Sequence, residues 1–147
     1  MSKHLKRCLL PVAFWIARIW WFIRRPHTKG VKCLVTCDDA MLLVRLSYSH
    51  KLWSIPGGGV HTDESDEAAI RREILEETGI TLGTLRFVGS YTQEIEYKHD
   101  TVACYHAQVT TRDVHIDGIE ISEATWFRRD NLPTDRATSI DRILQMI

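Results

Sequence analysis

The sequence has little cysteine, no net charge and no apolar run long enough to span a bilayer. Its four cysteines lack zinc-type spacing and are too few for a disulfide framework, so we expect buried, reduced thiols in a cytoplasmic protein. Nineteen basic and nineteen acidic residues cancel, which removes any global field for binding nucleic acid. The remaining composition is that of a globular protein, and 147 residues suffice for one domain with one core.

The N-terminal segment differs from the rest of the chain. It carries basic residues and no acid before Pro26, and its most apolar stretch, residues 8–23, is shorter than the roughly 20 residues of a membrane span and contains Arg18. A helix here could pack on its own domain or on a second copy, as in a homodimer. Residues 1–25 could instead make peripheral contact with a membrane. A cleaved export signal is the third interpretation, although no small-x-small site follows. We therefore separate an N-terminal segment, 1–28, from a domain, 29–147.

The pattern after residue 28 mixes strands with two helices. Residues 31–36 and 41–46 predict a hairpin, 53–55 a short extended piece, 85–97 and 101–110 a second hairpin turning at 98–100, and 124–127 a further strand. Helices are predicted over 66–78, between Ser65 as N-cap and Gly79 after the end, and over 135–147. Strands flanked by helices indicate an α/β sandwich with a mixed sheet, plus an N-terminal helix.

The helix predicted over 66–78 has an unfavourable charge pattern. Glu73, Glu76 and Glu77 share one arc of the helix and lie at its C-terminal end, where the helix dipole disfavours negative charge. Ala69 lies in the same sector, so the arc borders the packed side of the helix. A solvated acidic face would explain neither feature. A hard divalent cation explains both, since Mg²⁺ prefers carboxylate and carbonyl oxygens and leaves positions open for substrate phosphates.

A glycine triplet precedes this helix. Gly57, Gly58 and Gly59 lack a Cβ, so their backbone can approach a metal ion or a phosphate closely. Arg72 lies beside Glu73 and close to the other glutamates, where it can orient a carboxylate or offset negative charge.

The segment from Gly58 to Ile80 resembles the Nudix box, G-x5-E-x7-R-E-U-x-E-E-x-G-U with U an aliphatic residue. Gly58, Glu64 and the run Arg72-Glu73-Ile74-Leu75-Glu76-Glu77-Thr78-Gly79-Ile80 match every defined position. The resemblance extends over about residues 29–133. It implies an α/β/α sandwich and a Mg²⁺-dependent enzyme, with Mn²⁺ as a substitute metal, that cleaves a phosphoanhydride bond in a small-molecule substrate, a nucleoside diphosphate linked to another moiety.

The resemblance also implies roles for individual residues. Glu73 and Glu77 would be the principal metal ligands, Glu76 would lie on or beside a second metal, and Gly57 would offer its carbonyl. Arg72 and Glu64 would orient the carboxylates. Glu120, with Glu123 as the fallback, matches a further carboxylate that approaches the metal in several members. The general base stays open between Glu73, Glu77 and Glu120.

The substrate is less defined than the reaction. Tyr97 roughly fits the tyrosine of dinucleoside polyphosphate hydrolases, and nucleotide sugars, ADP-ribose and nucleoside triphosphates stay open. Trp53, Tyr91 and Tyr105 could stack on a base, but packing is the expected role of each. His50, His61 and His99 are expected to be solvated loop residues. Two alternative functions are a module that senses a nucleotide without cleaving it and a membrane-associated hydrolase of a lipid-linked diphosphate.

Overall fold

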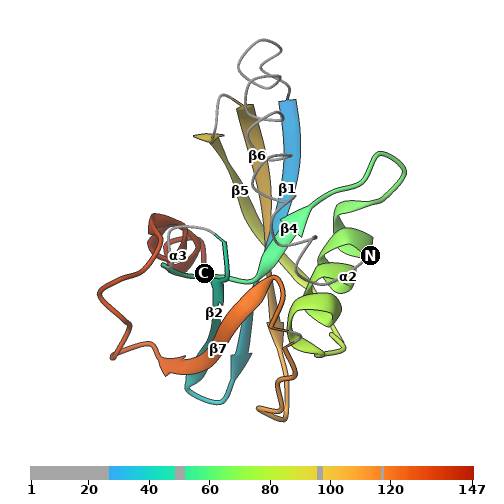
Figure 1. The fold of residues 1–147 in the computed structure, drawn as a ribbon. Helices are drawn as coiled ribbons and strands as arrows, with labels where there is room; N and C mark the ends of the chain where they lie inside the picture. Colours follow the sequence, from blue (N-terminus) through green and yellow to red (C-terminus); the bar gives the residue numbers. More distant parts are fainter. Residues whose placement is uncertain (1–26, 49–51, 96–97, 117) are drawn as a thin grey trace, which may run out of the picture.

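The computed structural model describes residues 27–48, 52–95, 98–116 and 118–147. Its centre is a seven-stranded mixed sheet with a helix on each face (Figure 1). Strand β1 (His27–Cys37) is the central element, since it pairs in parallel with β6 (Lys98–Gln108) along one edge. On its other edge it pairs antiparallel with β2 (Ala40–Leu46) and with β4 (Gly57–Gly59).

The remaining strands extend this sheet on both sides. Strand β5 (Arg86–Ile95) pairs with β6, whereas β3 (Trp53–Ser54) and β7 (Ile121–Arg128) pair with β2. The hairpin predicted from residues 31–36 and 41–46 is confirmed, and its turn is tight, with Cys37 opposite Ala40. One parallel pair among antiparallel pairs makes the sheet mixed, as predicted.

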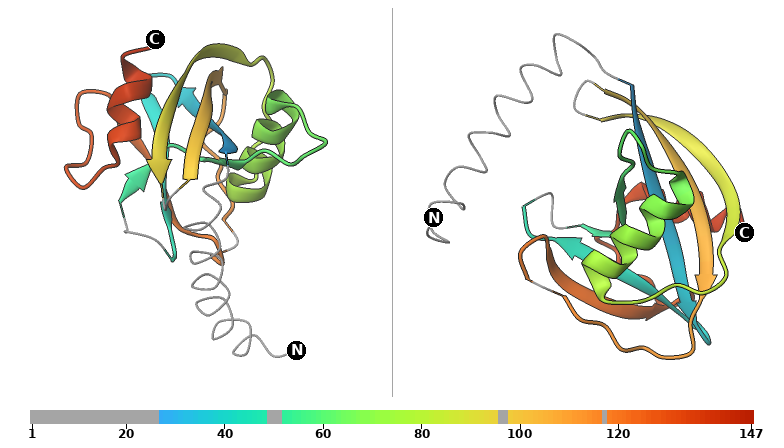
Figure 2. Two further views of the ribbon diagram at one scale, coloured as in Figure 1. Left: turned by 90° about the horizontal axis from the view of Figure 1, so that it is seen from above. Right: turned by 90° about the vertical axis from the view of Figure 1, so that its right-hand side faces the viewer.

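The two described helices cover opposite faces of the sheet. Alternate side chains of β1 point to opposite faces, so this strand contributes to the core under each helix. Helix α2 (Asp66–Thr78) packs Ala69, Ile70 and Ile74 against one face, which includes Val31, Cys33 and Val35. Helix α3 (Thr138–Leu144) packs Ile140 and Ile143 against the other, which includes Leu34 and Cys104. The views in Figure 2 show the sheet between the two helices, so the predicted α/β/α sandwich is confirmed. The predicted N-terminal helix lies outside the described residues.

Several predicted boundaries were wrong. Strand β1 begins at His27 rather than at 31, and β7 begins at Ile121 rather than at 124. The second hairpin does not turn at 98–100, because Ile95 pairs with Lys98 and the pairing continues through Gln93 and Asp100. Residues 98–100 therefore belong to β6. Helix α3 begins at Thr138 rather than at 135, because the backbone before it bonds to β3: Trp53 N–H donates to the carbonyl of Asp135 at 3.0 Å.

The cysteine prediction is confirmed where the structure describes it. Cys33, Cys37 and Cys104 are buried free thiols. Burial raises the pKa of Cys33 to about 12 and that of Cys104 to about 11, so both stay protonated at neutral pH. No helix in the described part of the chain is long and apolar enough to cross a membrane.

Candidate active site

Helix α2 begins and ends at the predicted residues. The Ser65 hydroxyl accepts a hydrogen bond from the Ala68 N–H at 3.1 Å, and Gly79 adopts the left-handed conformation, with φ of 72°. Its N–H donates to the carbonyl of Leu75 at 2.9 Å. Because both ends are set by local sequence, the glutamates of the last turns are held at defined angles around the helix axis.

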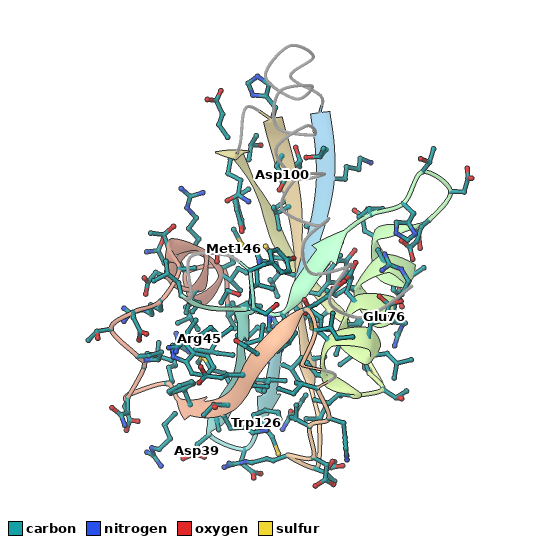
Figure 3. All side chains as sticks on the ribbon, in the orientation of Figure 1. Asp39, Arg45, Glu76, Asp100, Trp126 and Met146 are labelled. Carbon is teal, nitrogen blue, oxygen red and sulfur yellow. The ribbon has the colours of Figure 1, made fainter. Side chains whose placement is uncertain are left out.

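The three glutamates in the last turns of α2 differ sharply in burial. The Glu76 side chain is 61% exposed and projects from the surface of the helix (Figure 3). That of Glu73 is 13% exposed, and residue Glu77 as a whole only 7%. Exposure thus decreases from Glu76 through Glu73 to Glu77, as expected for an acidic arc that borders the packed face of the helix.

Arg72 connects the box residues through its planar guanidinium group. Its Nε and Nη2 donate to the two carboxylate oxygens of Glu64, each at 2.9 Å, and this bidentate pair holds the pKa of Glu64 down at about 2. Its Nη1 donates to Glu73 at 2.8 Å and to Glu76 at 3.3 Å, and Nη2 also donates to the Gly59 carbonyl at 3.0 Å. A single cation therefore orients three carboxylates and the glycine strand.

Two of the three glycines in β4 are required by close contacts. Gly57 has φ of +146°, and a Cβ there would lie 2.1 Å from the carbonyl oxygen of Val31. A Cβ on Gly58 would lie 2.4 Å from the carboxylate carbon of Glu73. A Cβ on Gly59 would meet nothing within 4 Å. The triplet therefore lets one strand pass between β1 and the acidic helix.

Glu77 is the buried end of the site. Its Oε2 accepts a hydrogen bond from the Gly57 N–H at 2.9 Å. Burial raises the pKa of Glu77 to about 7; the Gly57 N–H and Lys32 oppose this rise, and the charges of Glu73 and Glu120 add to it. This carboxyl group therefore lies in a dry region that already holds surplus negative charge.

Lys32 is a site residue that the sequence analysis missed. Its Nζ donates to the carbonyl of Ile55 at 2.9 Å, and burial lowers the pKa of its amine while Glu77, Cys104 and Asp100 oppose that shift. The available signal was a lysine inside the apolar run from Val31 to Val35. A charge there needs a buried partner.

The two acidic candidates before and within β7 are in different environments. Glu123 is engaged by Arg45, with 3.2 Å between its Oε1 and the arginine Nη1. Glu120 follows a loop whose backbone is bonded to the end of β2, since the Ser47 N–H donates to its carbonyl at 2.9 Å. Its charge raises the pKa of Glu77, which places it within electrostatic reach of the buried carboxyl group.

The donor set fits a hard divalent cation. Among the residues described, no three His, Cys, Asp or Glu side chains gather closely enough to enclose a metal ion by themselves. Mg²⁺ is usually bound through one or two carboxylates, and waters and substrate phosphates complete its shell. Glu73 and Glu77, with the backbone of β4 between them and β1, supply this kind of open, oxygen-rich site.

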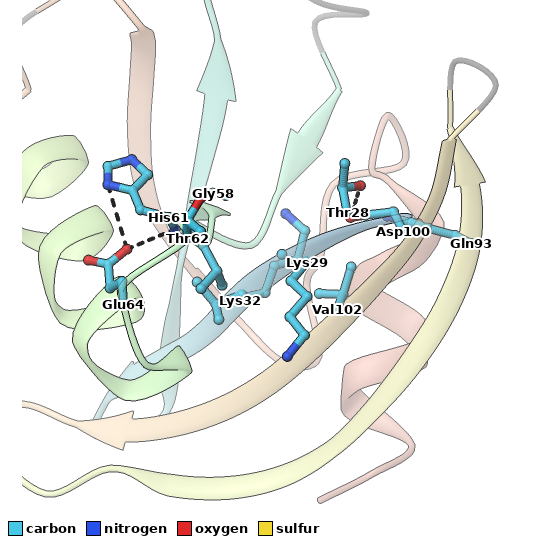
Figure 4. A pocket seen from close by; sticks show the side chains of 15 residues that line it. Thr28, Lys29, Lys32, Gly58, His61, Thr62, Glu64, Gln93, Asp100 and Val102 are labelled. Carbon is cyan, nitrogen blue, oxygen red and sulfur yellow. Dashed lines mark hydrogen bonds and ion pairs between the residues drawn. The ribbon is translucent and has the colours of Figure 1, made fainter. Parts of the chain in front are cut away.

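A pocket of about 760 Å³ adjoins the box. Figure 4 shows Glu64 and His61 at one end, Lys32 and Val102 in the middle, and Thr28, Asp100 and Gln93 at the other end. Its lining includes Gly57, Gly58 and Gly59 but not Glu73, Glu76 or Glu77. The backbone of β4 therefore forms the wall between the pocket and Glu73.

The aromatic candidates pack rather than line this pocket. Trp53 is buried, lies edge-on to Phe127 with 4.9 Å between ring centroids, and has the Arg45 guanidinium 4.4 Å from its ring. Tyr105 packs edge-on to Phe87, and Arg142 lies over Tyr91. The expectation of packing is confirmed for Trp53, Tyr91 and Tyr105. Tyr97 lies outside the described residues.

The histidine expectations have mixed outcomes. His61 is exposed and in a loop, as expected, with its N–H bonded to Glu64 at 3.2 Å. His99 lies in β6 rather than in a turn and pairs with Glu94 at 3.4 Å. His50 lies outside the described residues.

Comparison with known proteins agrees with this geometry. A sequence model of the NUDIX domain matches residues 26–146. The NAD-capped RNA hydrolase NudC of Shigella dysenteriae is 34% identical over 113 residues, and that of Shigella flexneri is 33% identical; each match covers 74% of this chain and 43% of the relative. The chain thus spans less than half of the length of these curated relatives.

Solved structures show the same fold. The MutT NUDIX hydrolase from Burkholderia pseudomallei superposes with a TM-score of 0.76 at 23% identity, over 82% of this chain and 98% of that one. The MutT protein from Methanosarcina mazei Go1 gives a TM-score of 0.68 at 27% identity, over 83% and 94% of the two chains.

Proposed function

The chain belongs to the Nudix family of hydrolases, and from that premise we propose that it is a Mg²⁺-dependent pyrophosphohydrolase of a nucleoside diphosphate linked to a further group. The observation that carries this proposal is Glu77, a carboxyl group buried beside Glu73 at the glycine strand. A buried, electronegative site is costly to the fold unless a cation occupies it.

In the proposed reaction, the side chains of α2 hold the metal and orient the phosphates. Glu73 and Glu77 would be the principal ligands, the Gly57 carbonyl would be a backbone ligand, and Glu76 would lie on or beside a second metal. When bound, the metal polarises phosphoryl oxygens and stabilises the leaving phosphate. Arg72, fixed by Glu64, keeps the Glu73 carboxylate in one orientation.

The proton of the attacking water goes to a nearby carboxylate. Glu73, Glu77 and Glu120 are all candidates for this base. The charge of Glu120 acts on Glu77, which favours it over Glu123, the partner of Arg45. The pKa of Glu77, near 7, is suited to proton transfer at neutral pH, but a metal ligand would hold that group ionised.

A phosphate-release screen tests the proposal. The substrates are nucleotide sugars, dinucleoside polyphosphates, ADP-ribose, nucleoside triphosphates and, because relatives act on NAD-capped RNA, NAD and a NAD-capped oligonucleotide. Each is assayed with Mg²⁺ and with Mn²⁺. We expect metal-dependent turnover of at least one substrate, and a loss of about 100-fold or more in kcat for Glu77→Gln.

Glu67→Gln is the matched control for this variant. Glu67 lies in the first turn of the same helix, where it pairs with Arg71 at 2.9 Å, and its side chain is 59% exposed. We expect its kcat to stay close to that of the wild type. Nucleotide binding without turnover of any substrate would favour the sensing module instead, and unchanged turnover in Glu77→Gln would refute the site assignment.

A further inference from the structure

The pocket ends in three polar side chains from three neighbouring strands. The Thr28 hydroxyl donates to Asp100 Oδ1 at 2.7 Å, and the Gln93 Nε2 donates to Asp100 Oδ2 at 3.3 Å. Thr28 is opposite Asp100 in the β1–β6 ladder, and Gln93 is opposite it in the β5–β6 ladder. The three residues, which we name the Asp100 row, all line the pocket (Figure 4).

We propose that Asp100 determines substrate specificity by accepting hydrogen bonds from two adjacent donor groups on the nucleoside part of the substrate. This inference rests on the proposed function, because it concerns the same substrate and the pocket that adjoins the same site. It assigns a role to a residue outside the Nudix box.

The first support is the hydrogen-bonding capacity of the row. An ionised carboxylate has about four acceptor positions. Thr28 and Gln93 fill one on each oxygen of Asp100, which fixes the plane of the carboxylate and leaves one position on each oxygen. The Thr28 hydroxyl has used its only proton, so it too can offer the pocket only lone pairs. Gln93 keeps one N–H and its carbonyl oxygen, so the row offers more acceptors than donors and favours a ligand that is rich in donors.

The second support is the sign of the charge. A carboxylate repels phosphate, so the phosphates of a nucleotide cannot lie at the Asp100 row. They fit the opposite end of the pocket, where Arg72 offsets the charge of Glu64 through two hydrogen bonds and Gly58 belongs to the box. A nucleotide in the pocket is thereby oriented, with its uncharged part at Asp100.

Two chemical groups present adjacent donors to such a carboxylate. One is the pair of vicinal hydroxyls on a ribose. The other is the edge of guanine, where the ring N1–H and the 2-amino group lie side by side; adenine, cytosine and uracil place an acceptor next to each donor on that edge. The shared feature is two neighbouring donors, and the two sources can be separated by experiment.

The third support is the space left in front of the row. A Cβ on Gly30 would lie 3.5 Å from Asp100 Oδ2, 3.5 Å from Val102 Cγ2 and 3.6 Å from the Gly58 carbonyl oxygen. These are ordinary contact distances, so an alanine fits without moving the protein. Its methyl group would, however, occupy space between the Asp100 row and the glycine strand. Gly30→Ala is therefore a variant that obstructs the pocket while the fold is kept.

Equilibrium binding provides the test. We would measure dissociation constants of GDP, IDP, ADP and 2′,3′-dideoxy-ADP by calorimetry on the full chain, with Ca²⁺ replacing Mg²⁺ to limit turnover. Asp100→Asn keeps the shape of the side chain but replaces an acceptor with a donor. Asp113→Asn is the control, since Asp113 is exposed and outside the pocket, and we expect it to leave every constant unchanged.

Either of two results would support the inference. If Asp100 accepts hydrogen bonds from guanine, GDP should bind at least about tenfold more tightly than ADP and than IDP, which lacks the 2-amino group. If Asp100 accepts hydrogen bonds from the ribose hydroxyls, GDP, IDP and ADP should bind alike, and 2′,3′-dideoxy-ADP should bind at least about tenfold more weakly. In both cases Asp100→Asn removes the difference, and Gly30→Ala weakens the preferred nucleotide without lowering Tm.

The inference would be overturned if Asp100→Asn kept the wild-type ratios, if the wild type did not discriminate, or if a folded Gly30→Ala bound all four nucleotides as the wild type does. Gly30→Ala keeps the test decisive should Asp100→Asn fail to fold. Failure of the hydrolase proposal would give a different result, namely no metal-dependent turnover of any substrate in the screen. The binding ratios do not depend on turnover, so the two failures can be distinguished.

Discussion

Replacing Glu77 by glutamine separates what this carboxyl group does for the fold from what it does for the site. The glutamine amide oxygen can still accept the hydrogen bond from the Gly57 N–H, so the shape of the site is retained. The substitution removes the negative charge of a residue that is only 7% exposed. We therefore expect Glu77→Gln to be more stable than the wild type when no metal is bound, although it loses activity.

The size of the gain follows from the pKa of Glu77, which burial raises from 4.5 to about 7. A shift of this size corresponds to about 3 kcal/mol of unfolding free energy. The figure already includes the attraction of Lys32, which opposes the rise, and it is an upper limit because the glutamine amide brings N–H donors that must also be buried. Net gains of about 1–3 kcal/mol are expected at pH 8.

The stability of the wild type should change with pH in one direction. Between pH 4.5 and about 7 the folded protein holds a proton that the unfolded chain releases, so wild-type stability falls as pH rises through this window. Below the window both states are protonated and the cost is absent; above it the full cost applies. The advantage of Glu77→Gln should thus be largest at pH 8 and shrink by about 1.4 kcal/mol for each pH unit below 7.

Urea unfolding in EDTA at several pH values between 5.5 and 8 measures this advantage. Glu76→Gln is the control, because its side chain is 61% exposed, and its unfolding free energy should change by less than about 1 kcal/mol. Adding Mg²⁺ should stabilise the wild type more than Glu77→Gln, since binding to the folded state adds to stability by mass action. A gain that is absent, or that does not vary with pH, would refute the reasoning.

Two further variants test neighbouring parts of the site. Gly58→Ala puts a Cβ 2.4 Å from the carboxylate carbon of Glu73 and should lower kcat by about tenfold or more, whereas Gly83→Ala, whose Cβ meets nothing within 4 Å, should match the wild type in the same phosphate-release assay. Glu120→Gln should lower kcat more than Glu123→Gln; equal effects in parallel kinetic assays would remove Glu120 from the site.

The sequence predicted the elements whose signals are local. Ser65 and Gly79 mark the two ends of α2 because a helix cap involves residues three or four positions apart. The same holds for the turn between Cys37 and Ala40. For this reason the acidic helix, and the crowding of its glutamates, can be located from the order of the residues alone.

The Asp100 row could not be predicted, because it depends on pairing between distant strands. Thr28 and Asp100 are 72 residues apart and meet only because β1 and β6 pair in parallel. Composition assigns the polar residues 98–100 to a turn, yet they lie in β6, where Gln93 pairs with Asp100. Parallel strands are not joined by a tight turn, so the register of their pairing cannot be predicted from residues that are neighbours in the sequence.

Strand β4 connects the carboxylates of the site to the wall of the pocket. On the side of the helix, the Gly57 N–H bonds Glu77, and the Gly59 carbonyl accepts from Arg72. On the side of the sheet, the same strand pairs with Gly30 and Lys32, which line the pocket. A shift of β4 would move the carboxylates and the pocket wall together, so substitutions in this strand should alter KM and kcat jointly. Asp100 lies in β6, which is separated from β4 by β1. Substitution of Asp100 should therefore change the nucleotide preference and leave kcat for the preferred substrate close to that of the wild type.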